Sequence, residues 1–385
     1  MSAPSSVPLV VHVIDQLGIG GLEVVLVNLI NNTPTDRYRH AIICLRGATD
    51  FKNRITVPGV SIHTLGRRPG KDFSVFRRMW SVLRKLRPAI VHSHNLPTID
   101  MCVPAKLAGV RRLVHSEHGW DISEERGSSR KYNMMRKVLS PLVDRYVPVS
   151  KDIETWLRTG VGLPASKVLH IYNGVDTDFF HPAEGNLIPL PAPGFDLANR
   201  VVFGTVGRMQ TVKDQVNLAK AFVELSRLRP DLMERARLAM IGDGDLKAEC
   251  ESVIAAAGLT DKTWLPGARN DVAELLRGLN VYVLPSISEG ISISILEAMS
   301  CGLPVAATRV GGNPELVLEG ETGLLMPSRD PVALAEALAT YMDQPELMQK
   351  HGAAGRQRIE QSFSVTSMVN GYLGQYDQLL GRQHP

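Results

Sequence analysis

The sequence is poor in cysteine and in aromatic residues, and it contains no long hydrophobic run. Its four cysteines are scattered, without a CxxC pair or a histidine pattern beside them, so they predict neither a disulfide framework nor a zinc site. No apolar run reaches the ~18 residues that a transmembrane helix needs. The start, MSAPSSVPLVVHVID, lacks the basic region of a signal peptide. We therefore expect a cytoplasmic protein in a reducing compartment.

Charge is unevenly distributed along the 385 residues, a length that predicts two or three domains. Residues 1–190 hold 25 Lys and Arg against 16 Asp and Glu, a balance of +9, whereas the remainder balances at −5. The basic first half favours an anionic partner. Nucleic acid is disfavoured, because aromatic residues make up only 5% of the chain and do not alternate with the basic ones.

The segment from Arg67 to Arg87 is the most basic stretch of the sequence. At helical spacing it places four large apolar side chains on one face, namely Phe76, Met79, Trp80 and Leu83. One interpretation is a helix over about residues 72–87 that contacts an anionic membrane surface, which would make the protein peripheral at the inner membrane. The other is a helix that packs its apolar face on a sheet and leaves its charges in water. The sequence leaves both open.

Short β-rich runs alternate with helical patterns along most of the chain, which predicts an α/β protein with parallel sheets built from βαβ units. Residues 181–199, rich in Pro, Gly and Asn, are typical of a linker between domains at 1–180 and 200–363. We expect a last helix, about 364–385, to pack back on the first domain. The expected strands are Leu9–Ile14, Ala41–Leu45, Ser61–Leu65, Ala89–His92, Leu113–Ser116, Tyr146–Val149, Val168–Ile171, Val201–Thr205, Leu238–Ile241, Val281–Leu284 and Val305–Thr308.

The stretch from Pro285 to Val305 follows one of these strands and combines a small-residue loop with a helical pattern. The first N–H groups of a helix have no intrahelical partner and carry partial positive charge, so this segment predicts an anion site. Glu289 in the loop and Glu297 in the helix bracket the turn. A carboxylate beside such a site can accept hydrogen bonds from sugar hydroxyls, but two solvated surface acids would give the same pattern.

Two cations follow another expected strand, Val201–Thr205, in the order Gly207-Arg208 and then Lys213. Arginine holds two phosphate oxygens at once, whereas lysine acts as a point charge. When the bond between a sugar and a diphosphate breaks, negative charge builds on the leaving group. Fixed cations at that place stabilise the transition state more than the ground state.

Histidines lie just past two expected strands of the first half, at the sheet edge where open parallel sheets bind ligands. They are His92 and His94 in one segment and His118, followed by Gly119, in the other. Histidine forms hydrogen bonds in either sense near neutrality.

A glycine-rich turn, Gly18 to Glu23, follows the first strand. Glu23 stands at the position of the third glycine in the motif G-x-G-x-x-G, which disfavours binding of a nicotinamide dinucleotide.

Two D-x-D pairs, Asp176 with Asp178 and Asp243 with Asp245, have the form of a metal site that bridges carboxylates to a diphosphate. We interpret both as structural and predict no metal ion. The later segment from Gly311 to Leu316 predicts a helix start, with Asn313 as the N-cap and Pro314 at the first helical position.

Taken together, E-x7-E, G-R-x4-K and G-G-x-x-E resemble the motifs of family 4 glycosyltransferases over roughly residues 8–375. The resemblance implies the GT-B fold, two Rossmann-like domains that face a cleft, and a nucleotide-diphosphate sugar as donor substrate with no cofactor. It implies catalytic roles for His118, Arg208, Lys213 and Glu289. It also implies that the donor lies against Gly20, Gly21, Gly207, Gly267, Arg269, Gly290, Ile291, Ser292, Ile293 and Glu297.

The family resemblance further implies metal-independent transfer with retention of configuration, to a saccharide or lipid-linked acceptor. The most similar subgroup is that of sugar transferases in bacterial exopolysaccharide and exosortase-associated gene clusters. Where that family usually has an aromatic or small residue and Gly-Leu, this chain has Ile291-Ser292-Ile293, which leaves the donor sugar open. A sugar-nucleotide epimerase of the same fold is the alternative. A non-catalytic scaffold is disfavoured, because Arg208, Lys213, Glu289 and Glu297 are all present.

Overall fold

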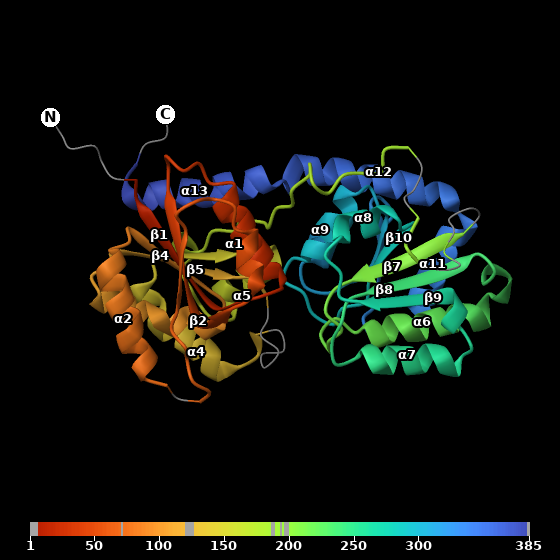
Figure 1. Ribbon diagram of the computed structural model, residues 1–385, viewed down its shortest axis with the longest axis horizontal. Helices are drawn as coiled ribbons and strands as arrows, with labels where there is room; N and C mark the ends of the chain where they lie inside the picture. Colours follow the sequence, from red (N-terminus) through yellow and green to blue (C-terminus); the bar gives the residue numbers. More distant parts are fainter. Residues whose placement is uncertain are drawn as a thin grey trace. The chain divides into compact units, whose positions relative to one another are not determined.

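The computed structural model describes residues 7–70, 72–119, 127–185, 189–192, 195 and 200–382. They form two units, each an α/β layer arrangement around one six-stranded parallel sheet (Figure 1). Unit 1 runs to Gly174 and includes the segment from Val365 onward, whereas unit 2 spans Val175–Ser364. The expectation of parallel sheets with crossover helices is confirmed.

The sheet of unit 1 has the strand order β3-β2-β1-β4-β5-β6. The chain starts at β1, adds β2 and β3 on one side, and then adds β4, β5 and β6 on the other. The order therefore reverses between β1 and β4. The strands are β1 Leu9–Leu17, β2 Arg39–Ala48, β3 Ser61–Thr64, β4 Ile90–His94, β5 Arg112–Glu117 and β6 Arg145–Pro148; the helices are α1 Gly21–Asn31, α2 Ser74–Leu86, α3 Cys102–Leu107, α4 Arg130–Leu139, α5 Lys151–Thr159 and α13 Val365–Leu380.

The sheet of unit 2 repeats this plan with the order β12-β11-β10-β7-β8-β9, so its reversal lies between β7 and β10. In open α/β sheets such a reversal, at the carboxyl ends of the strands, is where ligands bind. The strands are β7 Val201–Val206, β8 Ala236–Ile241, β9 Thr263–Gly267, β10 Val281–Leu284, β11 Val305–Thr308 and β12 Gly323–Met326; the helices are α6 Gln215–Leu228, α7 Lys247–Ala256, α8 Val272–Arg277, α9 Ile293–Ser300, α10 Asn313–Leu316, α11 Pro331–Asp343 and α12 Pro345–Ser362.

The central strands are buried on both faces, which explains their continuous apolar sequences. Every residue of β8, β10 and β11 is buried. In unit 2, Phe203 of β7 packs in one cluster with Phe222 of α6 and Tyr341 of α11, and none of the three is exposed. Burial of large side chains of this kind contributes about 1.5–3 kcal/mol each, which fixes the strands whose ends carry the site.

Helix α13 is the last helix of the chain and belongs to unit 1, although unit 2 precedes it in the sequence. Its Asp377 accepts a hydrogen bond from Tyr38 Oη at 2.7 Å and pairs with Arg37 Nη2 at 2.5 Å. Its Tyr376 Oη lies 2.7 Å from Nδ1 of His92 in β4. Polar contacts to both β4 and the segment before β2 therefore fix this helix on the unit.

Several local expectations were wrong. Residues 168–171 form no strand, since Val168 makes only an isolated bridge to Tyr146. Strands β9 and β12 were not predicted, because the first contains Pro266 and Gly267 and the second begins at a glycine. In α2 the buried stripe is Val75, Met79 and Leu83, whereas Trp80 is 42% exposed.

The stretch expected as a linker, 181–199, lies partly outside the described residues. Its described part belongs to unit 2, where Leu190 and Phe195 are buried. Residues 175–180 belong to that unit as well. Val175 N donates to Phe363 O at 2.9 Å, and Ser300 Oγ donates to Phe180 O at 2.6 Å, so backbone and side-chain hydrogen bonds hold this segment to α9 and the end of α12.

Candidate functional site

The carboxyl ends of β7 and β10 meet at the reversal of the unit 2 sheet, and the two charged motifs follow these two strands. The loops are joined by a backbone hydrogen bond from Ile287 N to Val212 O at 2.9 Å. Lys213 from the first loop is thereby brought to Glu289 from the second. Sequence positions 76 residues apart thus form one polar centre where a ligand is expected.

Glu289 is only 8% exposed, and its Oε1 accepts two hydrogen bonds. Lys213 Nζ donates to it at 2.6 Å, and Ser286 Oγ donates at 2.6 Å. A nearly buried carboxylate needs such partners, since an unpaired charge there would be strongly destabilising. The second oxygen, Oε2, has no hydrogen-bond partner among the described residues and is the acceptor that a sugar hydroxyl could use.

The backbone around Glu289 is held by the glycine turn after β11. Gly311 adopts φ +49°, and a Cβ at this position would lie 1.9 Å from Glu289 O. Gly312 N donates to Gly290 O at 3.0 Å. Only glycine fits such a close approach of two backbones, so the G-G motif positions the Glu289 loop.

Ser292 is the N-cap of α9, and its hydroxyl accepts a hydrogen bond from Ile295 N at 3.4 Å. Ser294 Oγ lies 3.1 Å from Ser292 Oγ. The remaining first-turn N–H groups supply the partial positive charge expected of an anion site. Ile291 beside this turn is 4% exposed, so its bulk lies within the fold.

Arg208, the first residue after Gly207, is exposed, and no acceptor for its guanidinium is found among the described residues. Its backbone is fixed, because Gln215 Nε2 donates to Arg208 O at 2.9 Å. Gly207 N pairs with Ile241 O at 3.0 Å at the end of β8. The arginine side chain is therefore available to an anionic ligand at the same sheet edge as Lys213.

The other residues of unit 2 that were expected to contact the donor form hydrogen bonds or ion pairs within the protein. Arg269 forms a two-bond ion pair with Asp271, at 2.9 and 2.5 Å. Gly267 ends β9 with φ +83° and accepts from Gly242 N at 2.9 Å. Glu297 lies in the second turn of α9, is partly buried, and has polar partners.

In unit 1, His118 follows β5 at the carboxyl edge, where its backbone N–H donates to Asn95 Oδ1 at 2.7 Å. Asn95 has φ +60°, a conformation that few residues other than glycine adopt. His118 Nε2 lies 3.0 Å from His94 Nδ1, whereas its buried Nδ1 has no partner among the described residues. This nitrogen is the free hydrogen-bonding atom that a substrate hydroxyl could use.

The glycine turn after β1 reaches the same edge of the sheet. Gly20 is the N-cap of α1 and Gly21 its first residue. A Cβ on Gly20 would lie 2.4 Å from Glu23 Oε2, so the carboxylate of Glu23 folds back against the glycine. An acid at this helix N-terminus complements the partial positive charge of the first turn.

His118 continues a row of imidazole rings that crosses the sheet of unit 1. His12 Nε2 lies 3.0 Å from His40 Nδ1, and His12 Nδ1 lies 3.2 Å from His94 Nε2. Burial lowers the pKa of His118 to about 4 and that of His40 to about 4, and it lowers the pKa of His12 and His94 well below the usual range. The rings are therefore neutral at pH 7, and each carries one donor and one acceptor nitrogen.

His92 and His94, the other histidines singled out at this sheet edge, are both buried. His92 engages Tyr376 Oη through Nδ1 and Ser116 Oγ through Nε2, each at 2.7 Å. The nitrogens of His12, His92 and His94 are close enough to hold a metal ion. Each ring, however, already uses both nitrogens in hydrogen bonds to its neighbours, and no carboxylate of the described residues joins the group.

The two D-x-D pairs lie in turns. Asp176 Oδ1 accepts from Asp178 N and Phe179 N, both at 3.0 Å, and Asp243 Oδ1 accepts from Gly244 N at 2.8 Å. Asn313 is not the N-cap of α10, since Gly312 occupies that position and the Asn313 side chain donates to Thr308 O at 2.9 Å. All three segments are thus fixed by hydrogen bonds between a side chain and nearby backbone groups.

Three residues of the site were not singled out from the sequence. Ser286 holds Glu289, Asn95 holds the backbone of His118, and His12 links His94 to His40. The sequence offers a signal for Asn95, because asparagine tolerates positive φ and this one lies three residues past the expected strand Ala89–His92. Ser286 and His12 depend on partners distant in the chain, for which the sequence has no local signal.

Comparison with known proteins assigns the family. Residues 19–179 match the model described as Glycosyltransferase Family 4, and residues 196–358 match the model described as Glycosyl transferases group 1. The UDP-Gal:alpha-D-GlcNAc-diphosphoundecaprenol alpha-1,3-galactosyltransferase of Escherichia coli is 28% identical over 365 residues, which cover 91% of this chain and 92% of that protein. The D-inositol 3-phosphate glycosyltransferase of Thermobifida fusca is 28% identical over 310 residues, 78% and 67% of the two chains.

The fold has matches among solved structures. HepE of Anabaena, solved in complex with UDP and glucose, superimposes with a TM-score of 0.83 at 18% identity, covering 96% of this chain and 100% of that one. Among the described residues, no helix has both the length and the apolar character needed to cross a membrane. Because the two family models match successive parts that together span most of the chain, and the fold is that of GT-B enzymes, the protein belongs to the group 1 and family 4 glycosyltransferases.

Proposed function

We propose that this glycosyltransferase moves a sugar from a nucleotide-diphosphate donor to a saccharide or lipid-linked acceptor in bacterial polysaccharide biosynthesis, with retention of configuration. The observation that supports this proposal is the polar centre where the strand order reverses between β7 and β10. There Lys213 Nζ lies 2.6 Å from Glu289 Oε1, and the guanidinium of Arg208 has no acceptor among the described residues. The donor diphosphate contacts the two cations and the N-terminus of α9. The sugar contacts Glu289.

A uridine nucleotide is the first donor to test. The E. coli relative is named for UDP-Gal, and the Anabaena structure contains UDP and glucose. A buried carboxylate with one oxygen still open suits a neutral sugar hydroxyl better than a charged sugar, because a second carboxylate there would be repelled. The acceptor of the E. coli relative, a sugar on diphosphoundecaprenol, supports a lipid-linked acceptor here.

In the proposed mechanism Arg208 and Lys213 stabilise the charge that builds on the departing diphosphate. Their positions are fixed before the reaction, by the Gln215 contact to Arg208 O and by the ion pair of Lys213. Preorganised cations of this kind favour the transition state over the ground state. The departing phosphate takes the proton of the incoming hydroxyl, and His118 contributes its free Nδ1 as a hydrogen-bonding atom to a substrate hydroxyl.

We also propose that the reaction needs no metal ion, that the protein works in the cytoplasm, and that it contacts an anionic membrane peripherally. Two cations and a helix N-terminus supply the positive charge that a metal would otherwise bring. The basic face of α2 supports the membrane contact.

A thermal-shift screen of UDP- and GDP-sugars tests the donor, because a bound donor raises the melting temperature by mass action. Donors that shift the melting temperature are then incubated with and without a lipid-linked saccharide. Product that forms only with acceptor, and that carries the donor's anomeric configuration by NMR, supports retaining transfer. A changed donor sugar without acceptor would instead identify an epimerase.

A further inference from the structure

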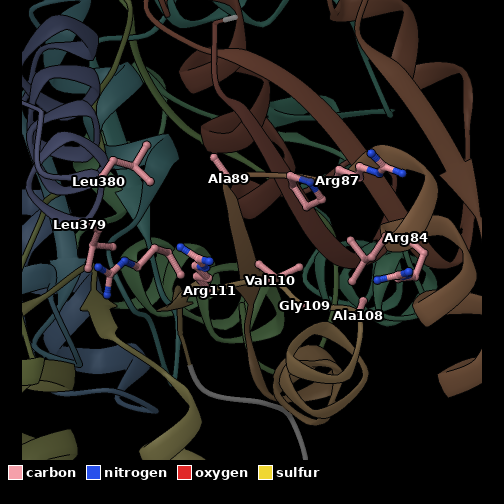
Figure 2. Close-up of a pocket in the computed structure, with 12 residues that line it drawn as sticks. Arg84, Arg87, Ala89, Ala108, Gly109, Val110, Arg111, Leu379 and Leu380 are labelled. Atoms are coloured by element: carbon pink, nitrogen blue, oxygen red, sulfur yellow. The ribbon is translucent and has the colours of Figure 1, made fainter. Parts of the chain in front are cut away.

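A basic hollow lies at the edge of unit 1 opposite to His94 and His118. It has a volume of about 570 Å³ and forms where α2 ends, where β4 and β5 begin, and where α13 ends. Four arginines line it, namely Arg84, Arg87, Arg111 and Arg112, and its lining contains no acidic residue. Figure 2 shows Arg84 and Arg87 on one side and Arg111 on the other, with Leu379 and Leu380 of α13 beyond.

The charge of this hollow is largely uncompensated. Among the described residues, Arg84, Arg87 and Arg111 have no ion pair, and Arg112 has only Asp144 at 3.6 Å. Like charges gathered around a concave surface repel each other and raise the local concentration of anions. An anion that binds several guanidiniums relieves this repulsion.

One of the four arginines is held in a strained conformation. Arg87 caps α2 with φ 48° and ψ 54°, the left-handed region where glycine is preferred at a helix end. Strain at a residue that lines a hollow is a reason to look for a function there. Beside the hollow, Trp80 is 42% exposed and Leu107 is 73% exposed, with Trp80 Nε1 donating to Leu107 O at 3.3 Å.

We propose that this hollow, the arginine pocket, binds a phosphate-type anion apart from the donor site. Guanidinium groups bind phosphate oxygens in pairs, and four of them suit a phosphodiester or diphosphate group. The exposed Trp80 and Leu107 favour a phosphate carried on a membrane lipid, because aromatic and aliphatic side chains enter the interface beside the headgroup. A soluble diphosphate has the same chemistry, and the test separates the two sources.

The test uses the full chain with Arg84→Gln, Arg87→Gly and Arg111→Gln, and with Arg227→Gln as the matched control, an exposed arginine of α6 in unit 2 that does not line the pocket. In the lipid arm, sedimentation with phosphatidylglycerol vesicles should weaken roughly fivefold for each pocket variant and less for the control. Phosphatidylcholine vesicles should not bind. The Arg87→Gly variant should also melt about 2–4 °C higher, since it relieves the strain while losing affinity.

In the soluble arm, titration with inorganic pyrophosphate should reveal a site that Arg84→Gln and Arg111→Gln weaken and Lys213→Ala leaves intact. Pocket-dependent binding of vesicles alone assigns a lipid headgroup, and pocket-dependent binding of pyrophosphate alone assigns a soluble phosphate. If neither arm depends on the pocket arginines, the proposal is overturned. The donor site is reported separately by the Lys213→Ala variant, so failure of one site is not failure of the other.

A second inference comes from the histidine row and rests on the proposed role of His118. The row His40–His12–His94–His118 has three nitrogen–nitrogen contacts, at 3.0, 3.2 and 3.0 Å, and each joins Nδ1 of one ring to Nε2 of another. A neutral imidazole carries one N–H and one acceptor nitrogen. All four rings must therefore carry their proton on the same nitrogen, either all on Nδ1 or all on Nε2.

The shared proton position determines whether each end of the row is a hydrogen-bond donor or an acceptor. Nδ1 of His118 and Nε2 of His40 are buried and have no partner among the described residues. With all protons on Nδ1, His118 presents a donor and His40 an acceptor, and with all on Nε2 the roles reverse. We infer that His94, His12 and His40 are positioning residues that fix whether His118 donates to or accepts from the substrate.

Nitrogen-15 NMR of the histidine rings in the donor-free protein tests this, because the shifts of protonated and unprotonated nitrogens differ. We expect His40 and His118 to have the same tautomer in the parent protein. His12→Phe should uncouple them, whereas His12→Gln, whose amide both donates and accepts, should keep the coupling. Opposite tautomers at His40 and His118, or one equivalent of zinc bound at His12, His92 and His94, would overturn the inference whatever the activity.

Discussion

Lys213 Nζ lies 2.6 Å from Glu289 Oε1, so the cation proposed for the donor phosphate is paired with the carboxylate proposed for the donor sugar. Ser286 donates to the same oxygen, which keeps Glu289 in place when the lysine turns to another anion. An entering diphosphate therefore has to share Lys213 with Glu289. Because the two residues compete in this way, steady-state kinetics of single variants can distinguish the contribution of Lys213 from that of Glu289.

Replacing the lysine removes a contact that strengthens in the transition state. We expect Lys213→Ala to lower kcat/KM by at least ~100-fold, the scale of one preorganised contact. Lys350→Ala is the control, since Lys350 is exposed on α12 away from the sheet edge. The same loss is expected for Glu297→Ala. Activity within a few-fold of the parent would contradict the site assignment.

Replacing the glutamate should separate binding from turnover. In Glu289→Gln the competing charge is gone, so Lys213 is free for the diphosphate and KM for the donor should fall or stay unchanged. The loss of the carboxylate beside the sugar should lower kcat by roughly 100-fold. Initial rates over a range of donor concentrations measure both constants. A rise in KM with kcat unchanged would show that Glu289 contributes to ground-state binding alone.

Two glycines with positive φ offer a matched pair. Gly311→Ala would place its Cβ 1.9 Å from Glu289 O, whereas Cβ at Gly320, with φ +73°, meets nothing within 4 Å. Both variants should lose about 1 kcal/mol of stability from backbone strain. Only Gly311→Ala should also lower activity, by ~10-fold or more, because the Glu289 loop has to move. The activities of the two variants are compared at the same interval below each melting temperature. Equal activities would disprove the positioning role of Gly311.

The buried pair Glu117–Arg136 predicts a pH effect on stability. Burial alone would raise the pKa of Glu117, but Arg136 Nε at 2.7 Å and His115 Nε2 at 3.3 Å lower it from 4.5 to about 2. A carboxylate with a lowered pKa stabilises the fold above its unfolded pKa. This contribution should be lost as the pH falls from about 4.5 to about 2, as followed by denaturant unfolding.

The same pair gives a mutational test. Arg136→Met leaves the Glu117 carboxylate buried without its cation, removes the guanidinium from the Trp156 ring, and should cost about 3–5 kcal/mol. Adding Glu117→Leu to that variant should recover part of the loss, because no buried charge then remains. If the double variant unfolds no later than the single one, the charge imbalance is not the cause.

Chelation tests the absence of a metal from the reaction. With Arg208, Lys213 and the start of α9 proposed as the positive groups around the diphosphate, activity should be unchanged by EDTA. Full loss on chelation, restored by Mg²⁺ or Mn²⁺, would return attention to Asp176 and Asp243, whose carboxylates make only turn contacts among the described residues.

The architecture was predictable because its signals are local. The alternation of β-rich and helical patterns, together with glycine turns after strands, places β7 and β10 and the residues at their ends. Strands β9 and β12 were missed because they contain proline or begin with glycine, and in both cases pairing to a neighbouring strand overrides propensity. Residues 168–171 show the opposite error: their sequence predicts a strand, but they form only one isolated β-bridge, between Val168 and Tyr146.

The contacts within the site were less predictable, because they join distant segments. The sequence places Lys213 and Glu289 at strand ends but does not give their ion pair or the Ser286 hydroxyl between them. It also places His118 at a sheet edge, but its lowered pKa comes from burial in the folded unit, and its contact to His94 joins it to a distant strand. Tertiary neighbours of this kind have no signature in residue spacing.

The position of α13 has a consequence for biosynthesis. Unit 2 is continuous and can acquire its native contacts as soon as Ser364 has left the ribosome. Unit 1 begins first but stays incomplete, with Tyr38 and His92 lacking the partners that Asp377 and Tyr376 provide. The second half of this enzyme is therefore expected to mature before the first, against the usual order of translation.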